Sequence, residues 1–244
     1  GTSMFTDVQM KGNIHRFQLM SETIHENFAE PGHFDAWWRL MEEMVMRPLV
    51  KEGQFDEKIV RREKRSIIER KEAVYEYKSR FARKRLLEWM RPDDPASASR
   101  YGTIQQVEDV TATSLYREYT RMLQQDELIF YIVGDVDIQE VKRRLLQHFN
   151  LNPQVEEIPA YTCTSQPKAH YVREQQSMQQ GQLQIGYRLP IYYGDDDFFV
   201  MQVANGLFGG FSHSKLFQNV REKESLAYSI SSGYSSQYGL LLVG

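Results

Sequence analysis

The sequence predicts an α+β fold, because strand-like alternation stands at both ends of the chain and long helical patterns fill the stretch between them. Residues 4–20 alternate around a Lys-Gly-Asn turn, which predicts one or two strands. Their expected core contributors are Ile14, Phe17 and Leu19. Residues 54–90 contain no Gly or Pro and carry apolar residues at helical spacing, so they predict one long helix or two abutting ones. A chain of 244 residues is long for one domain and comfortable for two.

The remaining elements follow from the same two periodicities. Apolar residues at helical spacing predict further helices at residues 34–45, 113–123, 138–149, 196–208 and 212–223. Short apolar or alternating runs predict strands at residues 128–133, 170–174, 183–189, 226–231 and 238–243. The helix from residue 138 has the clearest start, since Asp137 precedes it and Glu140 follows three residues later, as in a capping motif.

Composition excludes several classes of protein. Hydrophobic residues make up 41% of the chain and charged residues 26%, which excludes disorder as the main state. A net charge of −3 provides no general attraction to nucleic acid or to an anionic membrane, and no apolar run approaches the length of a membrane span. The single cysteine, Cys163, excludes an internal disulfide and a thiolate metal cage. It favours a reducing compartment, so we expect the protein to be cytoplasmic.

The ends and the middle of the chain indicate how it is organised. The chain begins at once with strand-like sequence and stops within an apolar run, so we expect a piece of a longer protein whose last strand leaves an open sheet edge. Prolines and few periodic apolar residues mark a linker near residue 160. The predicted organisation is a first domain at residues 1–152, a linker at 153–168 and a second domain at 169–244.

Two other site types are disfavoured by residue spacing. No two of the six histidines are four residues apart, and neither H-E-x-x-H nor H-x-x-E-H occurs, so we expect no metal site within this chain. Basic residues are in excess along the helical run, at Arg61-Arg62, Lys64-Arg65, Arg70-Lys71 and Arg83-Lys84-Arg85. Glutamates interleave with these cations, which favours a solvated helix face over a nucleic-acid interface, although the charge could also face an acidic peptide or a partner.

A glycine-rich turn, Gly209-Gly210-Phe211-Ser212, joins two predicted helices. No Walker-type Lys-Ser/Thr follows it, so it does not predict a phosphate site, and by itself it indicates a tight turn. The residues after it change that interpretation: Leu-Phe, then Arg-Glu-Lys, then Leu-Ala-Tyr, over residues 216–228. With this turn, the sequence resembles the second half of the insulinase/pitrilysin family of zinc peptidases, which includes the mitochondrial processing peptidases.

The resemblance spans nearly the whole chain in the family's order. Residues 131–137 resemble the end of the family's first half, and residues 55–70 resemble its long helix beyond the zinc motif. It implies two related domains, each a largely antiparallel sheet with helices on one face, enclosing a chamber that holds a peptide. The predicted domains would then be the remainder of the first peptidase-like domain and the start of the second.

The resemblance also implies site residues. Arg221 and Tyr228, seven residues apart, match the family pair that holds the substrate carbonyl, and guanidinium and phenol groups are suitable donors to an oxyanion. Gly209, Gly210, Phe211 and Ser212 are the expected substrate-binding residues. The family's H-x-x-E-H would lie before Gly1. Its third zinc ligand falls on Arg61, a cation that repels zinc, unless the match slips by one turn to Glu57.

Three functions remain open. The leading hypothesis is a zinc-less subunit that handles peptides and contributes Arg221 and Tyr228 to a zinc-bearing homologue. The second is a conventional zinc endopeptidase whose H-x-x-E-H lies upstream, and the third is a peptide-binding or scaffold subunit without a catalytic contribution. We therefore expect no cofactor in this chain, with zinc in a partner or in the missing N-terminal part. The expected partners are a peptide and a homo- or hetero-oligomeric neighbour, without nucleic acid or membrane.

Overall fold

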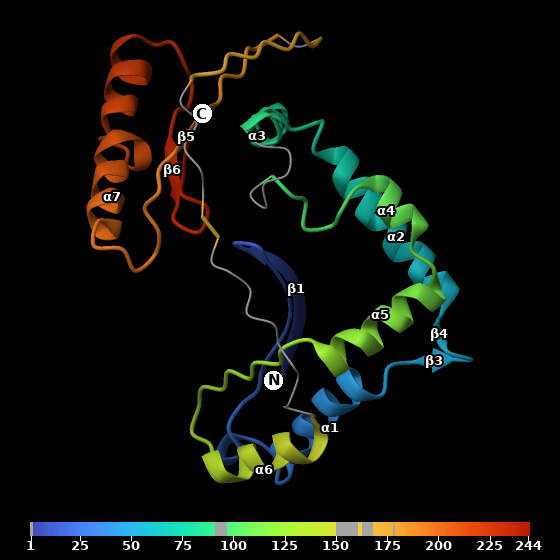
Figure 1. The fold of residues 1–244 in the computed structure, drawn as a ribbon. Coiled ribbons are helices and arrows are strands. Elements are labelled where there is room, and N and C mark those ends of the chain that lie inside the picture. Colours follow the sequence, from blue (N-terminus) through green and yellow to red (C-terminus); the bar gives the residue numbers. More distant parts are fainter. Residues whose placement is uncertain (1, 91–96, 150–160, 163–167, 178) are drawn as a thin grey trace. The chain divides into compact units, whose positions relative to one another are not determined.

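A computed structural model describes residues 2–90, 97–149, 161–162, 168–177 and 179–244 (Figure 1). It confirms the α+β class, with small antiparallel sheets and many helices. The chain divides into two compact units that interleave along the sequence. Unit 1 takes residues 1–9, 16–68 and 103–157, and unit 2 takes residues 10–15, 69–102 and 158–244. The predicted domain boundaries stay predictions, and most of the predicted linker lies outside the described residues.

The first element is the predicted hairpin, formed by β1 (Ser3–Lys11) and β2 (Ile14–Glu22). Gly12 in its two-residue turn has a φ of 61°, a conformation that glycine adopts without strain. The expected core contributors Ile14 and Phe17 are exposed, so that prediction is wrong, while Leu19 is half-buried. Alternation specifies two faces of a strand, but only the packing of other elements decides which face is covered.

Helices α1 (His33–Met46) and α6 (Ile138–His148) are joined in unit 1 by one arginine. Arg144 donates to Asp35 at 2.5 Å and to Glu140 at 2.6 Å, and its guanidinium lies over the ring of Trp38. Trp38 and Val141 are the buried residues of the two helices. The 3-10 turn η1 (Glu26–Phe28) precedes α1.

The long helical run forms two helices, α2 (Glu57–Ala73) and α3 (Lys78–Met90). A small hairpin, β3 (Val50–Lys51) and β4 (Gln54–Phe55), leads into α2. The remaining helices of unit 1 are α4 (Ile104–Asp109) and α5 (Ala112–Gln125), each begun by a threonine capping box. The Phe55 ring packs edge-on against Tyr116 and Tyr119 of α5. The sequence predicted α5 but not α4, whose six residues are too few to show a helical period.

The sheet of unit 2 contains β5 (Ile185–Arg188), β6 (Ser232–Ser235) and β7 (Leu240–Val243), in the order β5-β7-β6 with antiparallel pairs. All four residues of β7 are buried. The last strand is therefore central, and the expectation that it leaves an open edge is wrong. A run of four apolar residues suits a strand that is covered on both faces.

In unit 2, α3 packs against β5, and one carboxylate ties α3 to the segment before the sheet. Glu174 accepts hydrogen bonds from Arg85 Nη2 at 2.6 Å and from Trp89 Nε1 at 3.0 Å. The bond from Arg85 lowers the pKa of the Glu174 carboxyl.

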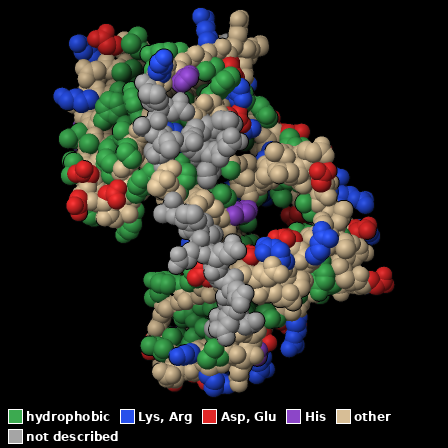
Figure 2. All heavy atoms as spheres, viewed as in Figure 1, with side chains coloured by type: hydrophobic (Ala, Val, Ile, Leu, Met, Phe, Trp, Pro, Cys, Tyr) green, Lys and Arg blue, Asp and Glu red, His purple; other side chains and the backbone are tan. Residues whose placement is uncertain are grey.

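Helix α7 (Phe198–Asn205) lies beside β6 and continues into a π-helical turn, η2 (Gly206–Gly210). A second π-helical segment, η3 (Phe217–Lys223), completes the predicted helix pair. Hydrophobic side chains gather on the surface over α7 (Figure 2), including Phe199, Val200 and Val203. The inner face of α7 meets the sheet.

Three predicted strands are wrong. Residues 128–133, 170–174 and 226–231 are outside regular secondary structure. Tyr131, in the first of these runs, is 89% exposed. A strand exists only where a neighbour pairs with its backbone. Within the described part of the chain none of these runs forms a strand of a sheet, and only Ser231, at the end of the third run, exchanges backbone hydrogen bonds with Gly244. Among the described residues, no helix is both long and apolar enough to cross a membrane.

Candidate functional site

The structure brings the predicted pair Arg221 and Tyr228 together. The Arg221 guanidinium carbon lies 5.8 Å from the centre of the Tyr228 ring and 4.6 Å from the centre of the Phe217 ring. The Nε atom of Arg221 lies 3.6 Å from Oε1 of Glu222. One cation is thus held among two rings and a carboxylate at the end of η3.

The local sequence explains this geometry. Ser214, which is buried, starts the helix, and its Oγ accepts from the backbone N of Phe217 at 3.4 Å. The helix ends at Lys223, and Ser225, with a φ of 50°, turns the chain back. The backbone N of Leu226 then donates to the carbonyl of Val220 at 3.0 Å. This reversal brings Tyr228 alongside the last helical turn, next to Arg221.

Both side chains are accessible at the surface of unit 2. Tyr228 is 91% exposed, and among the described residues its hydroxyl has no hydrogen-bond partner. The Arg221 side chain is 40% exposed. A guanidinium and a phenol that are close together and accessible can donate to the same carbonyl oxygen. The arrangement suits the stabilisation of negative charge on an incoming group.

The glycine-rich turn has a clear packing role. Gly209 is buried, and a Cβ added there would lie 2.5 Å from Ser232 Oγ and 2.7 Å from Leu216 Cδ1. Phe211 stacks on His213 at 5.4 Å. Within the described residues, no hydrogen bond or ring contact joins the turn to Arg221 or Tyr228. Substrate binding by Gly209, Gly210, Phe211 and Ser212 therefore stays a prediction.

The described residues do not form a zinc site. Among them, no group of three or more His, Cys, Asp or Glu side chains could hold a metal ion, and Cys163 lies outside them. Arg61 and the alternative ligand Glu57 are both exposed on α2. Lys64, three residues after Arg61 on α2, donates to the carbonyls of Glu108 and Val110 at 2.7 and 2.6 Å. This part of α2 therefore ties helices together and presents no ligand set.

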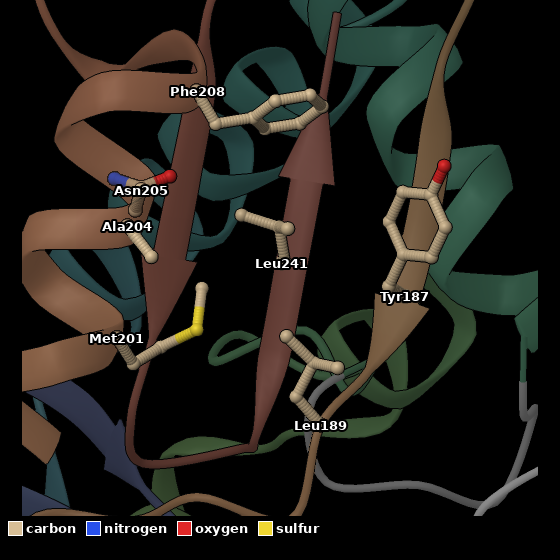
Figure 3. A pocket seen from close by; sticks show the side chains of 7 residues that line it. All are labelled: Tyr187, Leu189, Met201, Ala204, Asn205, Phe208 and Leu241. Carbon is tan, nitrogen blue, oxygen red and sulfur yellow. The ribbon is translucent and has the colours of Figure 1, made fainter. Parts of the chain in front are cut away.

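The sequence did not predict an apolar cavity of about 300 Å³ in unit 2. Figure 3 shows side chains of α7 and η2 facing those of β5 and β7 across it. Its lining residues are Tyr187, Leu189, Met201, Ala204, Asn205, Phe208 and Leu241. The Asn205 carboxamide oxygen accepts from Ser232 Oγ at 2.7 Å. Because most of its lining is apolar and the Asn205 oxygen is already engaged, the cavity resembles a gap in the packing more than a reaction site.

Comparison with known protein families shows which family the chain belongs to. The family described as "Peptidase M16 inactive domain" matches residues 109–244, which is more than half of the chain. The chain belongs to this family. This confirms the resemblance to a zinc-less member of the zinc peptidases.

Individual relatives agree with the family. The chain is 37% identical over its whole length to the probable inactive metalloprotease YmfF of Bacillus subtilis (strain 168), covering 58% of that protein. It matches the crystal structure of a conserved protein from Enterococcus faecalis V583 with a TM-score of 0.89 and 31% identity, covering 100% of this chain and 58% of that one. An M16 inactive domain from Pseudomonas fluorescens shares the fold at 16% identity, with a TM-score of 0.72 over 99% of this chain and 56% of that one. The chain therefore spans somewhat more than half the length of these relatives.

Proposed function

We propose that this M16 chain is part of a zinc-less subunit that supplies Arg221 and Tyr228 to the peptide-cleaving site of a zinc-bearing homologue. The supporting observation is the pairing of the two side chains, with the Arg221 guanidinium 5.8 Å from the Tyr228 ring and Tyr228 almost fully exposed. Tyr228 presents both its ring and its hydroxyl to whatever adjoins this surface.

The chemistry assigned to this chain is electrostatic. When a peptide bond is attacked, its carbonyl oxygen gains negative charge, and donors fixed near that oxygen stabilise the transition state more than the bound substrate. Arg221 would supply a permanent positive charge and Tyr228 a neutral hydroxyl donor. The attack on the peptide bond is assigned to the partner, because the described residues of this chain contain no group of three or more His, Cys, Asp or Glu side chains that could hold a metal ion.

The proposal includes a substrate class, a partner and a location. The substrate is a peptide, since the two donors suit an amide carbonyl, and the partner is a homologue with an intact H-x-x-E-H. A reducing compartment such as the cytoplasm suits a chain with one cysteine, Cys163.

The test uses the full-length protein, produced together with a zinc-bearing homologue from the same organism. Cleavage of an internally quenched fluorescent peptide is measured for the wild-type pair and for the Tyr228→Phe and Arg221→Ala variants. Loss of an oxyanion donor typically lowers turnover about 10²–10³-fold. We expect a fall of this order for each variant, with the complex still assembled in gel filtration.

Tyr193→Phe is the matched control, because Tyr193 is a second exposed tyrosine of unit 2. It should leave turnover unchanged. Unchanged turnover in both test variants would reduce the chain to a scaffold and contradict the proposal. Cleavage by the full-length protein alone, abolished by a zinc chelator, would also contradict it and favour a conventional endopeptidase.

A further inference from the structure

We propose that Phe217 is a positioning residue, whose ring holds the Arg221 guanidinium in place for the substrate carbonyl. This inference rests on the proposed function, since it concerns how the same site is organised. Phe217 itself is not assigned a contact with the reacting atoms.

The contact between the two side chains is close. The guanidinium carbon of Arg221 lies 4.6 Å from the centre of the Phe217 ring, which is nearer than the 5.8 Å to the Tyr228 ring. Both distances lie within the range at which a cation is attracted to the face of an aromatic ring. Phe217 is half-buried, so it forms the inner support, while exposed Tyr228 forms the outer one.

Hydrogen bonds hold the backbone around Phe217 in place. Its own N–H is bonded to the Oγ of buried Ser214, which ties the ring to the start of the helix. Phe217 and Arg221 then occupy one π-helical segment, η3, closed by a bond of 3.0 Å from Glu224 N to Asn219 O, five residues earlier. Such wide turns are rare, and they are often found at functional sites.

A support of this kind has a kinetic consequence. An arginine side chain has many rotamers. If the Arg221 side chain still moves among them in the bound complex, that conformational entropy must be lost when the transition state forms. A ring that already restricts the guanidinium reduces this loss. At an exposed site a cation–π contact corresponds to about two- to five-fold in an equilibrium or a rate.

A double-mutant cycle in the reconstituted complex tests the proposal. Phe217→Leu should lower kcat about two- to five-fold with little change in KM for the quenched peptide. In the Arg221→Ala background the same substitution should have no further effect, because its target is gone. Phe217→Tyr should restore kcat, since it keeps the aromatic face. Phe199→Leu, at an exposed phenylalanine of α7, should leave kcat unchanged in both the wild-type and the Arg221→Ala background.

A second measurement needs no partner. In the full chain, the Nε–H resonance of Arg221 should be displaced upfield by the Phe217 ring current. The displacement should decrease in Phe217→Leu, where only the more distant Tyr228 ring remains, and persist in Phe217→Tyr.

The outcomes separate the two proposals. If Arg221→Ala and Tyr228→Phe both leave turnover unchanged, the proposed function fails, whatever the resonance shows. If Arg221→Ala alone leaves turnover unchanged, the positioning role is overturned. If Arg221→Ala lowers turnover but Phe217→Leu is silent, or lowers kcat equally in both backgrounds, the positioning role is overturned and the proposed function stands.

Discussion

Gly209 shows how a residue can belong to a functional motif and still be explained by packing. It lies in the glycine-rich turn that the sequence associates with substrate binding. In the structure it faces Ser232 of β6 and Leu216, at distances that leave no room for a side chain. Because Gly209 has no side chain, η2 can pack closely against the sheet. The same close packing places Gly209 against Leu216, directly before the helix that carries Arg221.

We expect Gly209→Ala to destabilise unit 2 by about 1–3 kcal/mol, because the added methyl group would overlap buried neighbours. Gly233→Ala is the control, since a Cβ on Gly233 meets nothing within 4 Å. It should change stability by less than about 0.5 kcal/mol. Urea unfolding monitored by circular dichroism gives both values. Equal stability of the two variants would show that the turn relaxes around the added group.

Helix α6 shows what a local signal can determine at the scale of an element. Asp137 accepts from the backbone N of Gln139 at 2.8 Å and of Glu140 at 3.2 Å, as the sequence predicted. Glu140 does not complete a capping box. Hydrogen bonds from Arg143 and then Arg144 lower the pKa of its carboxyl to about 2. The start of α6 therefore depends on Asp137, while Glu140 helps to fix Arg144 against α1.

Asp137→Ala should destabilise unit 1 by about 1 kcal/mol, because two backbone N–H groups of the first turn lose their acceptor. Asp137→Asn keeps an acceptor oxygen and should cost much less. Thermal unfolding of the full chain, followed by circular dichroism, compares the two. If Asn proves as costly as Ala, the charge of Asp137 near the helix start matters more than its hydrogen bonds.

At the scale of the whole molecule, apolar residues stand on the surface of both units. Tyr131 and Val133 project from the unpaired run 128–133 of unit 1, and α7 carries a second group on unit 2. Extended apolar segments without a pairing partner are prone to associate with other chains. The acidic residues Glu127 and Asp135 flank the run 128–133 and limit this tendency.

We expect the 244-residue chain to self-associate at tens of micromolar, and the double variant Tyr131→Lys/Val133→Lys to do so less. Leu49→Lys is a matched control, because Leu49 is also about 89% exposed but lies outside the apolar run. Analytical ultracentrifugation over a concentration series measures the shift. A wild-type chain that sediments only as a 28.7 kDa species would refute the expectation of association.

The sequence by itself determined the features that depend on neighbours along the chain. The β1–β2 hairpin, α1, α5 and α6 follow from short-range periodicity, turns and caps, and the family follows from the pattern that ends in Arg221 and Tyr228. The pairing of those two residues was expected from the resemblance to the family, whereas the chain reversal at Ser225 that brings them together was not predicted.

Only the tertiary structure decided which strand-like runs pair. Residues 128–133 and β7 are similar apolar runs, yet β7 lies at the centre of a sheet, and the first run joins no sheet that the described residues form. The same holds for the packing role of Gly209 and for the cavity beneath α7. A helix satisfies its hydrogen bonds within its own segment, whereas a strand depends on residues distant in sequence, and no local pattern specifies which of them arrive.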